Sequence, residues 1–99
     1  MRQYCLMVFQ WDQANTGHIA EHEVTPEEAE QVMASDPMTR EFQIVDGEER
    51  WAALGTTNRG RVLLVWWTVR RERIRVVTAF EPAKRLKKAY LKERGMIER

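Results

Sequence analysis

One uninterrupted apolar run constrains the fold of this chain more than any other feature. The residues Val62, Leu63, Leu64, Val65, Trp66 and Trp67 follow one another inside a segment, Arg61–Val69, that we predict to be a strand. A strand with one solvent-exposed face alternates apolar and polar residues, whereas a continuous apolar run indicates a strand that is buried on both faces. We therefore predict a central strand whose two faces are covered by the rest of the chain.

Turn signals on both sides make this segment the middle of three antiparallel strands. Thr57-Asn58-Arg59-Gly60 precedes it, and asparagine and glycine tolerate the positive φ that a tight hairpin needs. Arg70-Arg71-Glu72 follows it and contains no glycine. The outer strands would be Glu48–Gly55 and the segment that ends at Phe80.

The remaining segments predict the element order β-α-α-β-β-β-β-α. Thr25-Pro26-Glu27-Glu28 is a capping box with proline at the first helical position, so a helix should begin there and end before Pro37. Asp46-Gly47 is a strong hairpin turn. The other predicted elements are a strand over Tyr4–Gln10, a helix over residues 13–22 capped by Asp12, a connector over Met38–Glu41, a strand over Phe42–Val45 and a helix over residues 82–94. In the first helix, Trp11, Ala14, His18, Ile19 and His22 should share one face.

The 99 residues predict one α+β domain over residues 1–99 with a modest core. The sheet should have four to five antiparallel strands, two N-terminal helices on one face, and a C-terminal helix. Cys5 is the single cysteine, so an internal disulfide is excluded. No stretch is long enough to span a membrane, and the N-terminus lacks a signal-peptide pattern, so we expect a cytoplasmic protein.

Charge is divided unevenly along the chain. Residues 1–50 hold 11 acidic and 3 basic residues, a net charge of −8, whereas residues 70–99 hold 4 acidic and 11 basic residues, a net charge of +7. Such asymmetry favours an anionic partner at the basic end. The alternative is that acidic helices neutralise basic strands within the fold, or that the charges form a solvated face.

The stretch His18-Ile19-Ala20-Glu21-His22 has the H-x-x-E-H spacing of one class of zinc peptidases. Two histidines one helical turn apart could share a metal ion, but the remaining carboxylates show no matching motif for a third ligand. We therefore predict no metal at His18 and His22. Two alternatives remain: both histidines are partly buried between helix and sheet, or they contact a ligand or RNA.

Arginines recur along the predicted strands, at Arg50, Arg61, Arg73 and Arg75. Guanidinium groups bind phosphate oxygens and stabilise negative charge that develops during phosphodiester cleavage. The alternative is that these arginines pair with the acidic helices. Three tryptophans, Trp51, Trp66 and Trp67, are predicted to belong to the core, with base stacking as the alternative.

Three stretches together resemble the BrnT family of type II toxins. They are Phe9-Gln10-Trp11-Asp12 with Asn15; then Glu21-His22-Glu23-Val24-Thr25-Pro26-Glu27-Glu28-Ala29; then Glu48-Glu49-Arg50-Trp51 through Gly55, Gly60-Arg61 and Arg73-Ile74-Arg75-Val76-Val77-Thr78-Ala79. The chain departs from the family where Thr78-Ala79-Phe80-Glu81 replaces a strand end that carries an arginine.

The resemblance implies a RelE-like fold, metal-independent RNA cleavage without a cofactor, and neutralisation by a BrnA-type antitoxin. His22, Arg50, Arg61 and Arg75 are then the candidate catalytic residues, with the histidine as acid or base. Candidates for contact with nucleic acid or the partner are His18, Arg73, Lys84, Lys87 and Lys88. The alternative is a non-catalytic module of the same family that binds a partner protein or nucleic acid.

Overall fold

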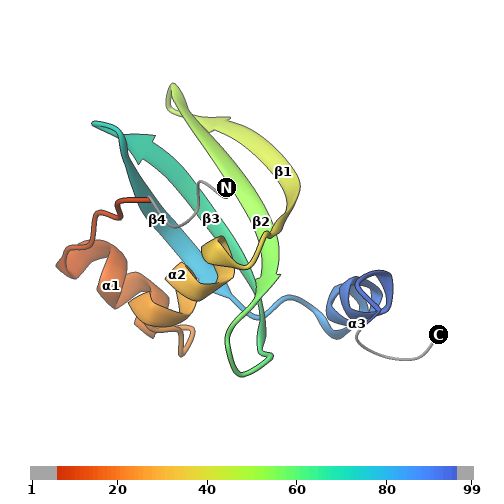
Figure 1. Ribbon diagram of the computed structural model, residues 1–99. Coiled ribbons are helices and arrows are strands. Elements are labelled where there is room, and N and C mark those ends of the chain that lie inside the picture. The colour runs from red at the N-terminus through yellow and green to blue at the C-terminus, as the bar shows by residue number, and fades with distance from the viewer. Residues whose placement is uncertain (1–6, 96–99) are drawn as a thin grey trace.

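The computed structural model describes residues 7–95 and shows a four-stranded antiparallel sheet with three helices (Figure 1). The strands lie in chain order, β1-β2-β3-β4, so each is paired with its neighbours through a hairpin. The elements are α1 (Gln13–Ala20), α2 (Pro26–Ala34), β1 (Met38–Val45), β2 (Glu48–Thr56), β3 (Val62–Arg70), β4 (Arg73–Phe80) and α3 (Lys84–Glu93). The described part of the chain has no helix of the length and apolarity needed to cross a membrane.

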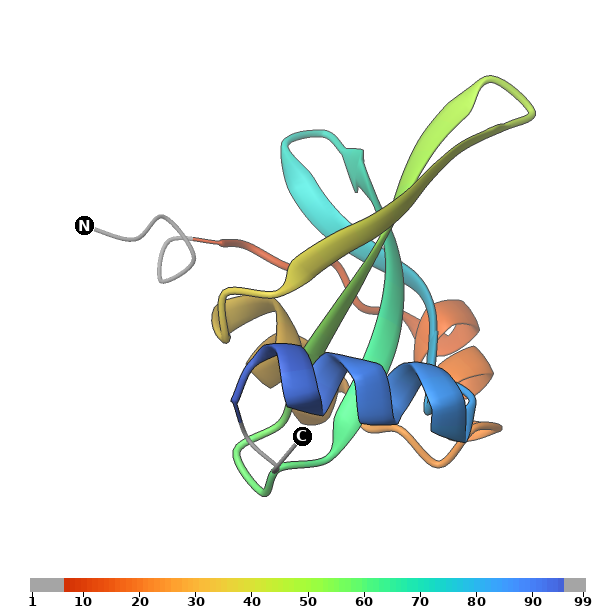
Figure 2. The same cartoon turned by 90° about the vertical axis from the view of Figure 1, so that its right-hand side faces the viewer.

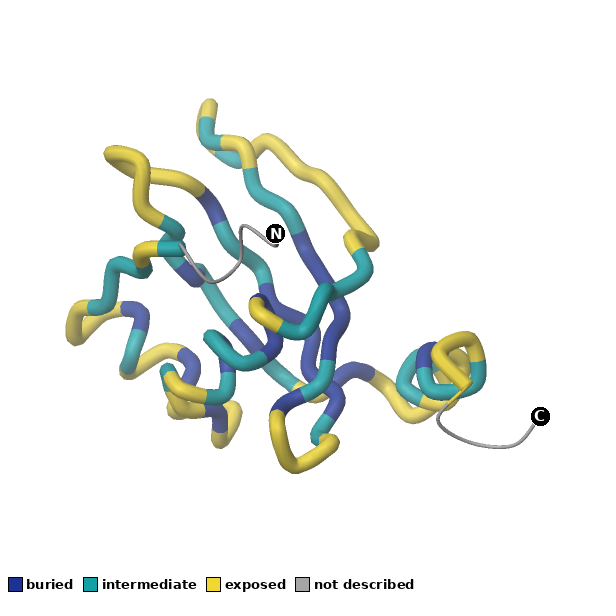
Figure 3. The backbone as a smooth tube through the Cα atoms, in the orientation of Figure 1, coloured by how far each residue is buried: buried dark blue, intermediate teal, exposed yellow. Residues whose placement is uncertain are grey.

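Strand β3 is central and covered on both faces, as its apolar run predicts. Its residues alternate between two cores: Leu63 and Val65 belong to one, and Val62 and Leu64 to the other. The buried backbone follows β2 and β3 through the middle of the molecule (Figure 3). The apolar run is therefore a strand buried between two layers of side chains.

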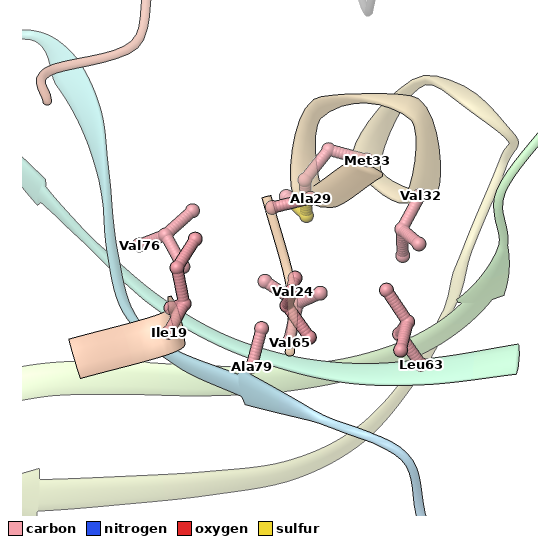
Figure 4. Close-up of a cluster of buried hydrophobic side chains, with 9 residues drawn as sticks. All are labelled: Ile19, Val24, Ala29, Val32, Met33, Leu63, Val65, Val76 and Ala79. Carbon is pink, nitrogen blue, oxygen red and sulfur yellow. The ribbon is translucent and has the colours of Figure 1, made fainter. Parts of the chain in front are cut away.

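The first core joins the sheet to α1 and α2 (Figure 4). Ile19 of α1 and Val32 of α2 are fully buried beside β3 and β4. Helix α2 begins as predicted, with Thr25 as N-cap and a reciprocal bond to Glu28. The two N-terminal helices thus lie on one side of the sheet.

The second core lies under α3, on the opposite face, where the helix crosses in front of the sheet (Figure 2). Tyr90 is the buried residue of α3, and Leu86 and Leu91 are half-buried beside it. Ala83 and Ala89 are exposed. The helix begins at Lys84, not at Pro82, and no side chain caps its N-terminus.

Two element predictions are wrong. Met38–Glu41 is the first part of β1, because Met38 pairs with Leu54 and the strand continues past a register shift at Arg40. Helix α1 ends at Ala20, and its buried residues are Asn15 and Ile19. Ala14, His18 and His22 are exposed, so the face we predicted for this helix is not its buried face.

The glycine-free turn after β3 forms a tight hairpin. Arg71 and Glu72 both have positive φ, 51° and 66°, which is the backbone of a type I′ turn made without glycine. The Asp46-Gly47 turn has the same pattern, at 50° and 80°. Both hairpins therefore project two-residue turns from the same end of the sheet.

The segment before α1 lies along the outer edge of β4. The Gln10 amide donates to the Ile74 carbonyl, and the Ile74 amide donates to the Val8 carbonyl, each at 2.8 Å. This parallel pairing is a single bridge at Phe9. Residues 4–6 of the predicted strand Tyr4–Gln10 lie outside the described residues.

Candidate nucleic-acid interface

Three arginines and a histidine line one hollow of about 250 Å³ at the edge of the sheet. Arg50 comes from β2, Arg70 from the end of β3, Arg75 from β4, and His18 from α1. Ala14, Asn15 and Val77 complete the lining. Arg50 alternates with Ala52 and Leu54 of the second core, so the hollow lies on the face that carries α3.

A β-bulge lies beside this hollow. Trp66 pairs with Thr78 and Trp67 pairs with Val76, so Val77 is an extra residue in β4. Bulges increase the local twist of a strand and redirect its side chains. Val76 is buried in the first core, while Arg75 and Val77 line the hollow.

A single carboxylate holds two of the three arginines. Glu48 accepts from Arg50 Nε at 3.0 Å through one oxygen and from Arg70 Nε at 2.9 Å through the other, which also lies 2.9 Å from Arg70 Nη2 in an ion pair. The hydrogen bond from Arg70, aided by the one from Arg50, lowers the pKa of Glu48. Within residues 7–95, Arg50 uses only its Nε–H in this way, so its two Nη groups remain available to an anion.

The third arginine is held by the residue that caps α1. Arg75 donates to both carboxylate oxygens of Asp12, at 2.8 and 3.3 Å, and its side chain is 12% exposed. The hydrogen bond from Arg75 and that from the Asn15 amide lower the pKa of Asp12. Three guanidinium groups face two carboxylates here, so the hollow retains a positive charge for a phosphodiester.

His18 and His22 are both exposed, so the alternative that buries them between helix and sheet is wrong. Their ring centroids are 5.8 Å apart, and His22 lies 5.7 Å from the ring of Phe80. Only His18 lines the hollow. Among the described residues, no group of three histidine, cysteine or acidic side chains could hold a metal ion.

Arg61 lies outside this hollow, in an ion-pair network that joins three segments. Its guanidinium donates to Glu28 at 3.0 Å, to Glu81 at 3.0 Å and to the Glu23 carbonyl at 2.7 Å. For Arg61, pairing with an acidic helix is therefore the arrangement observed. Burial raises the pKa of Glu28, but hydrogen bonds from the Thr25 amide and Arg61 outweigh it and leave that pKa lowered.

The remaining predicted contact residues lie outside the lining of the hollow. Arg73 is exposed at the start of β4. Lys84 and Lys88 are exposed on α3, while Lys87 is half-buried and lies 3.9 Å from Glu81. Trp66 and Trp67 pack against the two cores, and Trp51 stacks on Trp67 at 4.8 Å.

Three residues of the site were not predicted: Arg70, Glu48 and Asp12 in its role as partner of Arg75. Arg70 stood in a predicted turn, where a basic residue is ordinary. The position of Glu48 two residues before Arg50 on one strand was the available signal, because residues at that spacing share a face. The pairing of Asp12 with Arg75 spans 63 positions and had no local signal.

One protein family matches most of the chain. The model of a family described as the ribonuclease toxin, BrnT, of type II toxin–antitoxin systems matches residues 11–85. The match spans the three arginines and the histidine of the hollow, together with Glu48 and Asp12, and ends at the start of α3. A comparison with individual curated proteins found no match.

Proposed function

From the premise that the chain belongs to the BrnT family of ribonuclease toxins of type II toxin–antitoxin systems, we propose that it cleaves RNA at the arginine-lined hollow without a metal ion. The observation that carries this proposal is the convergence of His18, Arg50, Arg70 and Arg75 on one site. A RelE-like arrangement of the fold and a single domain over residues 1–99 are part of the same proposal.

The arginines bind the scissile phosphate and stabilise its transition state. Cleavage through the ribose 2′-hydroxyl builds negative charge on a pentacovalent phosphorus, and guanidinium donors fixed beforehand lower the barrier to that charge. Glu48 and Asp12 fix them in this structure. Arg50 contributes its free Nη groups, and Arg70 joins Arg50 and Arg75 as a third phosphate ligand.

We assign the proton transfer to His18, because it lines the hollow and His22 does not. An imidazole can take the proton of the 2′-hydroxyl or donate one to the leaving oxygen near neutral pH. Arg61 is assigned a structural role, since Glu28, Glu81 and the Glu23 carbonyl engage its donors. Both assignments change the roles that the sequence alone suggested.

The partner that this proposal implies is a BrnA-type antitoxin in the cytoplasm. An antitoxin that covers the face holding the hollow and α3 would exclude RNA from the arginines. Toxin activity and antitoxin binding would then compete for the same surface.

The test compares purified variants on a single-stranded RNA substrate in the presence of a chelator. Wild-type protein should cleave the RNA, while Arg50→Ala and His18→Ala should each slow cleavage at least about 100-fold, the lower range for a positioned acid, base or charge stabiliser. Arg59→Ala, an exposed arginine in the turn before β3, is the matched control and should cleave at the wild-type rate.

Two results would contradict the proposal. Cleavage that requires an added divalent ion would overturn metal independence. Wild-type protein that binds RNA, leaves it whole and does not arrest growth when expressed alone would instead support the non-catalytic binding module.

A further inference from the structure

A pair of rings adjoins the hollow and has no assigned role. We call His22 and Phe80 the aromatic step. His22 follows α1 in the loop, and Phe80 ends β4. From His18 at the rim of the hollow, ring centroids follow at 5.8 Å to His22 and 5.7 Å to Phe80. The step therefore extends the hollow along the surface toward α3.

The polar atoms of the His22 ring are not used by other described residues of the chain. It is exposed, and within residues 7–95 its imidazole contacts two other rings but makes no hydrogen bond or ion pair. Phe80 packs one side against the second core and is half-buried, with His22 beside it. The exposed His22 ring and the accessible part of Phe80, tilted by 58° to each other, form a surface against which a flat apolar group could pack.

Arg61 holds both sides of the aromatic step. Its guanidinium binds the carbonyl of Glu23, the neighbour of His22, at 2.7 Å and the carboxylate of Glu81, the neighbour of Phe80, at 3.0 Å. One side chain thus fixes the loop after α1 to the end of β4. The two rings are positioned before any ligand arrives, which lowers the entropy cost of binding.

We propose that the aromatic step is a subsite for a nucleobase, next to the phosphate held by the three arginines. This inference rests on the proposed function, because it places the base of a neighbouring nucleotide while the hollow binds the backbone. Aromatic side chains stack on every base through its π-face, so the subsite should bind with little sequence preference. Arg61 acts as a positioning residue for the rings.

The test is a binding titration with two short single-stranded probes. One is a 2′-O-methyl RNA oligomer, which lacks the attacking hydroxyl and stays whole, and the other is a fully abasic oligomer of the same length. The variants are His22→Ala, which changes an exposed side chain, and Phe80→Leu, which keeps an apolar group on the second core. Phe42→Leu is the control, since Phe42 is a half-exposed ring on the edge strand β1.

Phe80→Leu and His22→Ala should each weaken binding of the base-containing oligomer by about tenfold, within the range for loss of one stacked base. Neither should change binding of the abasic oligomer, and Phe42→Leu should change neither. Equal affinity of wild type and both variants for the base-containing oligomer would overturn the subsite alone. Wild-type protein that binds neither oligomer would overturn the proposed function together with it.

Discussion

At the scale of single residues, Asn15 and Asp12 connect the fold to the site. Asn15 is 3% exposed; its Oδ1 accepts from the Asp12 amide, and its Nδ2 donates to the carbonyls of Gln10 and Val76. Asp12 in turn caps α1 through the Asn15 amide and holds Arg75. One reciprocal pair therefore fixes the start of α1, the segment before it, strand β4 and an arginine of the hollow.

Asn15→Ala should lower the free energy of unfolding by about 2 kcal/mol, because two carbonyls lose their donor in a buried place. Urea denaturation of the variant measures this loss. Asn58→Ala is the matched control, since Asn58 is exposed in the turn before β3 and donates to Gln31 through its backbone amide. An Asn15→Ala midpoint equal to that of wild type would contradict the role of this amide.

Replacing Arg61 by alanine and replacing Arg50 by alanine should have different effects on stability and on RNA binding. Arg61→Ala loses three charge-assisted contacts at a partly exposed site, so we expect a stability loss of about 1–2 kcal/mol. Binding of an abasic oligomer should stay at the wild-type level. Arg50→Ala should show the opposite pattern: it should bind the abasic oligomer weakly and should lose less stability than Arg61→Ala. The reverse result would return Arg61 to the phosphate-binding residues.

At the scale of elements, the sequence predicted helix and turn positions correctly wherever a short local motif determines the backbone conformation. The Thr25 capping box, the Asp46-Gly47 turn and the stop before Pro37 all lie where the sequence placed them. Errors arose where tertiary pairing decides. The start of β1 forms a strand because Met38 has a partner in β2, and the buried face of α1 is set by Asn15 and Ile19 contacting β4.

The packing of α2 on β2 depends on a glycine. A Cβ at Gly55 would lie 2.8 Å from both Ser35 Oγ and Val32 Cγ1, so Gly55→Ala should force the helix away from the sheet and cost about 2 kcal/mol. Gly17→Ala is the matched change, because that Cβ meets nothing within 4 Å and alanine favours the helix by about 1 kcal/mol. The midpoint of thermal unfolding should fall for Gly55→Ala and rise for Gly17→Ala. A Gly55→Ala variant more stable than wild type would refute this close packing.

At the scale of the whole molecule, the sequence could predict the types of residue in the site but not their grouping. Arginines on neighbouring strands were expected to face a phosphodiester. Which of them converge depends on strand register and on the bulge at Val77, and neither leaves a local signal. The hollow is lined by Arg70 and His18, whereas the sequence had suggested Arg61 and His22 as catalytic residues.

The basic residues of the chain are concentrated toward its C-terminus, and several of them lie on α3. This basic helix and the hollow lie on the same face of the sheet, so both would contribute to the positive field that attracts RNA. Lys84 and Lys88 are exposed, and reversing them leaves the buried Tyr90 untouched. Lys84→Glu/Lys88→Glu should therefore weaken RNA binding without unfolding the domain, whereas Arg40→Glu, at an exposed position of the edge strand β1, should weaken it less.

Titrations at several salt concentrations distinguish a phosphate contact from a general field. Each phosphate that a lysine neutralises on a single strand contributes about 0.7 to the slope of log affinity against log salt. If both lysines contact phosphates, the double variant should reduce that slope by about 1.4 and lose its disadvantage at high salt. An unchanged slope with unchanged affinity would show α3 to be a solvated face. RNA contact would then come from the hollow and the aromatic step alone, and an antitoxin that covers α3 without covering the hollow would leave RNA binding intact.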